Sequence, residues 1–123
     1  MKVLVVDDAA FMRAILRKVL TEGGHEVVEA GSGAEALERY HDVQPDLVTL
    51  DITMPDMDGI ETLKALRAIA PQARVIMCSA MGQEGLVLEA IQLGALDFVV
   101  KPFKPDRILG AVTKAQQSLG VSA

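Results

Sequence analysis

Residues 47–59 read LVTLDITMPDMDG and combine an apolar run, an aspartate and a turn. The first four residues are largely apolar, which is typical of a strand covered on both faces of a sheet. Asp51 follows this run directly. Residues 54–59 carry the proline, aspartate and glycine that turns favour. Apolar residues then recur at helical spacing from 60 to 69, so the stretch predicts a strand, an acidic strand end, a turn and a helix.

The same alternation extends along the whole chain in both directions. Short apolar runs predict strands at residues 3–6, 26–30, 47–50, 75–78 and 98–100. Stretches with helical periodicity follow them at residues 11–20, 34–40, 60–69, 86–93 and 105–119. The second run is polar at both ends, which favours an edge strand, and Ser32 is the predicted N-cap of the helix after it. Strict alternation predicts a doubly wound α/β fold, with a parallel sheet covered by helices on both faces.

Length and composition exclude several classes of protein. The chain has 123 residues, 50% of them hydrophobic, and we expect residues 1–123 to form a single domain. A net charge of -5 argues against binding nucleic acid. Cys78 is the only cysteine, so neither a disulfide framework nor a cysteine zinc site is expected. The apolar start is too short for a signal peptide and no run is long enough to span a membrane, so the sequence predicts a soluble, cytoplasmic protein.

Polar side chains follow four of the five predicted strands. Asp7 and Asp8 follow the first strand, Asp51 the third, Ser79 the fourth and Lys101 the fifth, whereas the second ends in Ala30 and Gly31. In an open parallel sheet, function gathers at the carboxyl ends of the strands. If the first and third strands are neighbours, three carboxylates therefore meet in one crevice.

Three adjacent carboxylates would repel one another unless a divalent cation lay between them. Oxygen ligands favour Mg²⁺, for which Mn²⁺ can substitute, over zinc. Lys101 adds a positive charge and Ser79 a hydroxyl donor, and phosphoryl transfer needs such groups around the phosphoryl oxygens. A carboxylate can act as the nucleophile and form an aspartyl-phosphate. Asp51 is the predicted acceptor because it lies between the other groups, which leaves Asp7 and Asp8 to hold the metal.

These motifs closely resemble the receiver domain of two-component response regulators. The matching segments are Val5–Asp8, Asp51–Pro55 with Asp58–Gly59, Cys78–Ala80 and Lys101–Phe103, and the similarity extends from Lys2 to the last helix. Within the family, residues 7–13 and 79–83 are similar to chemotaxis regulators of the thermophilic and Gram-positive type. The resemblance implies a flavodoxin-like sheet with strand order 2-1-3-4-5.

The resemblance also implies a set of metal ligands. Asp8 and Asp51 would bind Mg²⁺ through their side chains, and Thr53 would bind it through its backbone carbonyl. Asp7 would act mostly through a metal-bound water. Asp8 by itself could instead cap the first helix, because aspartate is a common N-cap.

Phosphorylation and switching are assigned to four residues through the same resemblance. Asp51 would accept the phosphoryl group from a chemotaxis histidine kinase of the CheA type. Lys101 would pair with that group, Ser79 would move in to hydrogen-bond it, and Phe98 would follow by moving inward. The Lys101–Pro102 peptide bond would be cis.

The resemblance predicts partners as well as chemistry. The face made by the fourth helix, fifth strand and last helix would bind a flagellar motor switch protein, with the chain acting as a monomer. Thr53 and Met81 stand where some relatives carry amide or acidic side chains, which favours slow hydrolysis and a separate phosphatase. A phosphorelay intermediate is an alternative with the same acceptor site. An aspartate-based phosphatase is disfavoured, because such enzymes usually carry a second aspartate at the position of Thr53, and we expect no enzyme activity of that kind.

Overall fold

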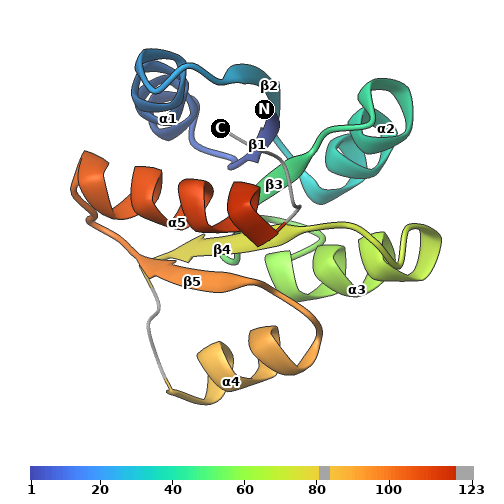
Figure 1. The fold of residues 1–123 in the computed structure, drawn as a ribbon. Coiled ribbons are helices and arrows are strands. Elements are labelled where there is room, and N and C mark those ends of the chain that lie inside the picture. Colours follow the sequence, from blue (N-terminus) through green and yellow to red (C-terminus); the bar gives the residue numbers. More distant parts are fainter. Residues whose placement is uncertain (81–83, 119–123) are drawn as a thin grey trace.

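The computed structural model describes residues 1–80 and 84–118, in which five strands alternate with five helices (Figure 1). The strands are β1 (Lys2–Val6), β2 (Glu26–Ala30), β3 (Leu47–Asp51), β4 (Val75–Ser79) and β5 (Asp97–Val100). The helices are α1 (Ala10–Glu22), α2 (Gly33–Val43), α3 (Gly59–Ile69), α4 (Glu84–Gln92) and α5 (Pro105–Ser118). Every predicted strand is confirmed to within one residue at each end, whereas the predicted end of the last helix, Leu119, lies outside the described residues.

The sheet is parallel and its strand order is β2-β1-β3-β4-β5, as the resemblance implied. β2 lies at one edge, which confirms the edge strand predicted from its polar ends. β1 pairs with both β2 and β3, so the strand order reverses at β1. Val6 and Leu50 are register partners, and the residues that follow them therefore leave the sheet side by side.

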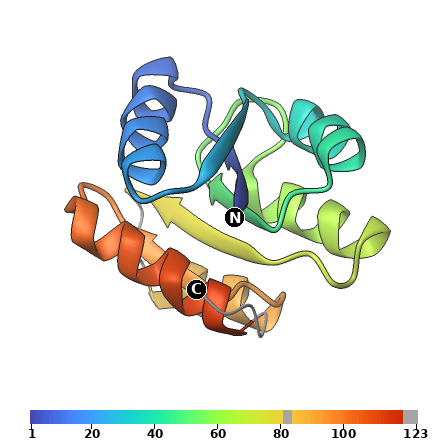
Figure 2. The ribbon, with the colours of Figure 1, turned by 45° about the horizontal axis from the view of Figure 1, so that its top comes forward.

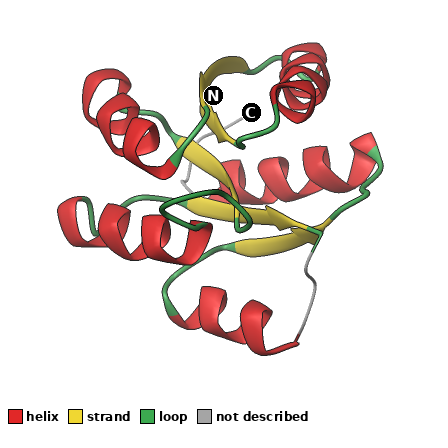
Figure 3. Ribbon diagram, turned by 180° about the vertical axis from the view of Figure 1, so that it is seen from behind, coloured by secondary structure: helices red, strands yellow, loops and turns green. Residues whose placement is uncertain are grey.

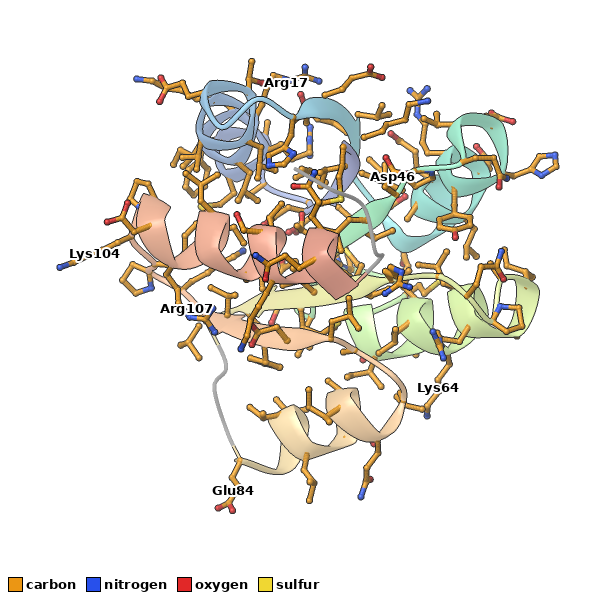
Figure 4. All side chains as sticks on the ribbon, viewed as in Figure 1. Arg17, Asp46, Lys64, Glu84, Lys104 and Arg107 are labelled. Atoms are coloured by element: carbon orange, nitrogen blue, oxygen red, sulfur yellow. The ribbon has the colours of Figure 1, made fainter. Side chains whose placement is uncertain are left out.

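Helices cover both faces of the sheet, as predicted. Figures 1 and 2 show α1 and α5 on one face, and Figure 3 shows α2, α3 and α4 on the other. Alternate residues of each strand enter different cores: Leu47 packs in the α1 and α5 core, and Val48 and Leu50 pack in the opposite one. Charged side chains such as Lys64, Glu84 and Lys104 project outward (Figure 4).

The loop after β3 is held by a close backbone approach at Gly59. The Gly59 N–H donates to the Ile52 carbonyl at 2.8 Å. A β-carbon at Gly59 would lie 2.1 Å from the carbonyl oxygen of Asp51, so only glycine fits. Asp58 caps α3 by accepting from the N–H of Glu61 at 2.8 Å. The turn thus brings the start of α3 against the end of β3 and fixes the backbone around Asp51.

Other local predictions hold in the structure. Ser32 caps α2 by accepting a hydrogen bond from the N–H of Glu35. The Lys101–Pro102 peptide bond is cis. No helix in the described part of the chain is long and apolar enough to cross a membrane.

Candidate phosphoryl-acceptor and metal site

Three carboxylates converge at the carboxyl ends of β1 and β3. Each of Asp7, Asp8 and Asp51 offers an oxygen, and these oxygens all lie within 4.8 Å of one another. Asp7 and Asp51 are buried, with 2% and 6% of their surface exposed, whereas Asp8 is exposed. The predicted meeting of these side chains is confirmed, and it follows from the direct pairing of β1 with β3.

Asp8 does not cap the first helix. The N-cap position of α1 is Ala9, which has no side-chain cap. It is Asp7 that bonds this end of the helix, since its Oδ1 accepts from the N–H of Ala9 at 2.9 Å. The Asp8 carboxylate is thus left at the mouth of the site.

Lys101 supplies the positive charge of the cluster. Its Nζ donates to Asp7 Oδ2 at 2.6 Å and lies 3.5 Å from Asp51 Oδ1. Its backbone N–H donates to the Ser79 carbonyl at 2.8 Å, which ties the loop after β5 to the end of β4. Burial lowers the pKa of Lys101, but the hydrogen bond to Asp7 and the charges of Asp51 and Asp7 outweigh it, and the pKa is raised overall. Lys101 is therefore a fixed cation.

Asp51 titrates abnormally because it is buried among other charges. Burial raises its pKa, Lys101 opposes that change, and the negative charges of Asp7 and Asp8 add to it, so the pKa lies above the ordinary value for aspartate. Three carboxylates against one ammonium leave a net negative site when all are ionised. Oxygen donors at this spacing, with one exposed member, fit a hard divalent cation such as Mg²⁺.

Comparison with known proteins agrees with this geometry. The profile of the response regulator receiver domain matches residues 3–113. The chain belongs to the response regulator receiver family. It is 58% identical over 114 residues to the chemotaxis protein CheY of Bacillus subtilis, covering 92% of this chain and 95% of that protein. It is 52% identical over 117 residues to CheY of Thermotoga maritima, covering 94% and 98%. The chain is thus a CheY-like receiver domain, as the resemblance indicated.

A solved structure of a relative leads to the same conclusion. The structure described as the CheX-CheY-BeF3-Mg+2 complex from Borrelia burgdorferi contains a chain that superposes with a TM-score of 0.90 at 39% identity. The match covers 99% of this chain and 90% of that chain.

Three other residues assigned to this receiver site lie in the described part of the chain. Ser79 is fully buried at the end of β4, and Thr53 is exposed in the loop after β3. Phe98 is 8% exposed and belongs to the core on the side of α3 and α4. That it moves on phosphorylation stays a prediction, as do the roles of Ser79 and the Thr53 carbonyl. Met81 lies outside the described residues.

Two further residues of this receiver domain lie close to the site. Cys78 is the register partner of Asp51, and burial raises its pKa to about 12. The thiol is therefore protonated and inert, and Cys78 is a buried part of the core. Arg13 was not singled out from the sequence, yet its guanidinium donates to the backbone carbonyl of Asp7. A helical arginine gives no sequence signal for a contact with a backbone oxygen six residues earlier.

Proposed function

We propose that this receiver domain is a phospho-acceptor switch of a two-component system. Asp51 takes a phosphoryl group from a phospho-histidine on a histidine kinase, with Mg²⁺ as cofactor, and the phosphorylated form binds a downstream protein. The observation that carries the proposal is the convergence of three carboxylates and one lysine at the ends of β1, β3 and β5. Residues 1–123 act in this proposal as a single receiver domain without an enzymatic turnover of its own.

Asp51 is the proposed nucleophile for a geometric reason. It belongs to the acidic cluster, and one of its oxygens lies 3.5 Å from Lys101 Nζ. The short hydrogen bond of Lys101 goes to Asp7 instead, which leaves the Asp51 oxygen available for attack. An Asp51 oxygen would attack phosphorus as the bond from phosphorus to the histidine nitrogen breaks. Lys101 would then pair with the new phosphoryl oxygens, while Asp7 would keep its hydrogen bond from the Ala9 N–H.

The metal is assigned to the same cluster. Asp8 and Asp51 would hold Mg²⁺ through their carboxylates, Thr53 would hold it through its carbonyl, and Asp7 would act indirectly. When bound, Mg²⁺ supplies charge neutralisation for the phosphoryl oxygens. The relative from Borrelia burgdorferi is described as a complex with BeF3 and Mg+2, which supports a divalent cation in this domain as well.

An apolar surface on α1 supports docking of the phosphoryl donor beside the site. Phe11 is 68% exposed and Ile15 is 46% exposed, although both belong to the apolar pattern of α1. Ile15 also lines a cavity of about 280 Å³, together with Met12, Ala80, Lys101, Pro102 and Phe103. Exposed apolar surface of this kind marks protein contacts. We assign this surface to a chemotaxis kinase of the CheA type.

A second surface, formed by α4, β5 and α5, supports the output partner. Leu88 is 56% exposed and Val100 is 47% exposed. Phe98 lines a cavity of about 450 Å³ together with Val100, Pro102, Phe103, Lys104, Asp106 and Arg107. Movement of Ser79 and Phe98 would change this surface when Asp51 is phosphorylated. We assign it to a flagellar motor switch protein, with the chain acting as a cytoplasmic monomer whose phosphate is removed by a dedicated phosphatase.

Intact-mass spectrometry with acetyl phosphate tests the proposal. The wild type should gain one phosphoryl group in Mg²⁺ and none in EDTA. Asp51→Asn should gain none, while the matched control Asp56→Asn, at an exposed turn position, should behave as wild type. Because rapid hydrolysis could hide an adduct, the same proteins should be titrated with beryllofluoride and followed by fluorine NMR. Absence of both the adduct and bound beryllofluoride would reject the proposed function.

A further inference from the structure

Arg13 bridges the acidic turn after β1 and the edge strand β2. From α1, its Nη1 donates to the carbonyl oxygen of Asp7 at 2.7 Å, and its Nε donates to Glu29 Oε1 at 3.1 Å. Only 21% of the Arg13 side chain is exposed. A single guanidinium thus connects the backbone of one proposed metal-site residue to a carboxylate on the neighbouring strand.

Asp7 is held at every polar atom, and Arg13 provides one of these contacts. The Asp7 N–H donates to the Ala30 carbonyl. Asp7 Oδ1 accepts from the N–H of Ala9, and Asp7 Oδ2 accepts from Lys101 Nζ. The Asp7 carbonyl belongs to the peptide unit that leads into Asp8. Fixing that carbonyl therefore fixes the plane from which the Asp8 side chain departs.

Asp8 depends on this backbone because little else holds it. It is exposed, and within residues 1–80 and 84–118 its carboxylate has no hydrogen-bond partner. An exposed carboxylate without partners samples several rotamers. The direction of its Cα–Cβ bond is thus the main feature that the folded chain controls.

Glu29 keeps Arg13 in place. Its other oxygen, Oε2, accepts from Arg17 Nε at 2.5 Å. The hydrogen bond from Arg17 lowers the pKa of Glu29, burial opposes this change, and the hydrogen bond from Arg13 adds to it, so the pKa lies below the ordinary value. Glu29 is therefore ionised at neutral pH. Gly31 leaves the space for the guanidinium, since a β-carbon there would lie 3.3 Å from Arg13 Nη1.

We propose that Arg13 is a positioning residue for the metal site, which holds the Asp7–Asp8 turn in its binding geometry and is itself oriented by Glu29. The inference rests on the proposed function, because it concerns the cation that the acceptor site would bind. Groups that orient metal ligands typically change metal affinity by about 10- to 100-fold.

Simple electrostatics predicts the opposite sign for the same residue. Arg13 is a cation beside an acidic cluster, so loss of its charge alone would strengthen the binding of a dication. A weaker affinity after its removal would therefore report lost positioning and not lost charge. Arg17 offers the matched control, because it is more exposed than Arg13 and pairs with the same Glu29, but its bond is to Glu29 and not to Asp7.

Mn²⁺ binding, measured from the EPR signal of the free ion, tests the inference. Arg13→Met should weaken Mn²⁺ binding about 10-fold or more. Arg17→Met should bind Mn²⁺ as wild type or slightly more tightly, and Glu29→Gln should fall between the two. In EDTA, amide exchange at residues 8 and 9, followed by NMR, should be faster in Arg13→Met and unchanged in Arg17→Met, because Arg13 bonds the Asp7 carbonyl whereas Arg17 bonds Glu29.

The outcomes separate this inference from the proposed function. Wild-type binding of Mn²⁺ with equal or tighter binding by Arg13→Met would overturn the positioning role and leave the phospho-acceptor intact. Failure of the wild type to bind Mn²⁺ would overturn both. If thermal unfolding shows that Arg13→Met does not fold, Glu29→Gln decides: wild-type affinity and wild-type amide exchange in that variant would overturn the inference.

Discussion

Removal of one negative charge from the acidic cluster should stabilise the metal-free protein. In Asp51→Asn, the side chain keeps its size but no longer repels Asp7 and Asp8. The variant is informative because Asp51 is 6% exposed, so solvent screens its interactions weakly. We expect a higher free energy of unfolding than in the wild type when all divalent cations are chelated.

The magnitude follows from the distances in the site. At an effective dielectric constant of about 20, each like-charge pair at the 4.8 Å limit costs roughly 3.5 kcal/mol, and two such pairs involve Asp51. The attraction of Lys101 at 3.5 Å offsets roughly 4.7 kcal/mol of this repulsion. The net gain for Asp51→Asn is therefore about 2 kcal/mol. For a chain of 123 residues this raises the midpoint of thermal unfolding by about 8 °C.

Thermal unfolding followed by circular dichroism in EDTA measures this gain, since the chain has no tryptophan for fluorescence. Glu38→Gln, which removes one exposed negative charge from α2, is the control and should leave the midpoint nearly unchanged. The pKa of Asp51 is raised in the folded wild type, so as the pH falls the folded protein binds a proton at a higher pH than the unfolded protein does. The free energy of unfolding of the wild type therefore increases as the pH falls through this range. The difference in unfolding midpoint between Asp51→Asn and the wild type should thus be largest at pH 8 and become smaller in acid. An equal or lower midpoint for Asp51→Asn at pH 8 would refute the reasoning.

Three further predictions concern other parts of the fold. Gly59→Ala places a β-carbon 2.1 Å from the carbonyl oxygen of Asp51 and should lower the free energy of unfolding, measured in urea, by about 3 kcal/mol. The control Gly85→Ala, which has open space around its β-carbon, should not lower this free energy. Cys78, with a pKa of about 12, should react with a disulfide reagent at pH 8 at least about 1000-fold more slowly in the folded than in the urea-unfolded protein, and equal rates would contradict its burial. Lys101→Met should lower the free energy of unfolding in EDTA by about 3 kcal/mol, because it leaves the buried carboxylates of Asp7 and Asp51 without their cation. Mg²⁺ should restore part of that loss, and the exposed Lys104→Met should show neither effect.

The order of elements and the acidic strand ends could be predicted because they follow from local patterns. A continuous apolar run that stops at a charged residue marks a buried strand and its end, as in residues 3–8 and 47–51. Parallel pairing then brings the ends together without further information. The residue types at those ends were enough to suggest a metal and a phosphoryl group.

Side-chain partners could not be predicted in the same way. Lys101 makes its short bond to Asp7 and a longer contact to Asp51, a choice decided by side-chain reach. Arg13 bonds a backbone oxygen, which no residue pattern encodes. The second strand looked featureless at Ala30 and Gly31, although the residue before them, Glu29, holds Arg13.

Burial along α1 was also only partly predictable. Phe11, Ile15 and Val19 share one helical stripe, which predicts a common buried face. In the structure only Val19 is buried, and the exposed fraction rises to 46% at Ile15 and 68% at Phe11. The apolar stripe extends further along α1 than the core does, and its exposed end, at Phe11 and Ile15, lies beside the acceptor site.

Localisation of the phosphoryl group tests the central claim most directly. The protein would be treated with acetyl phosphate and Mg²⁺, the acyl phosphate would be reduced with borohydride, and the modified residue would be located by tandem mass spectrometry of peptides. We predict modification at Asp51 and at no other residue, with none in EDTA. Modification at Asp7, Asp8 or an aspartate of the turn after β3 in place of Asp51 would contradict the account.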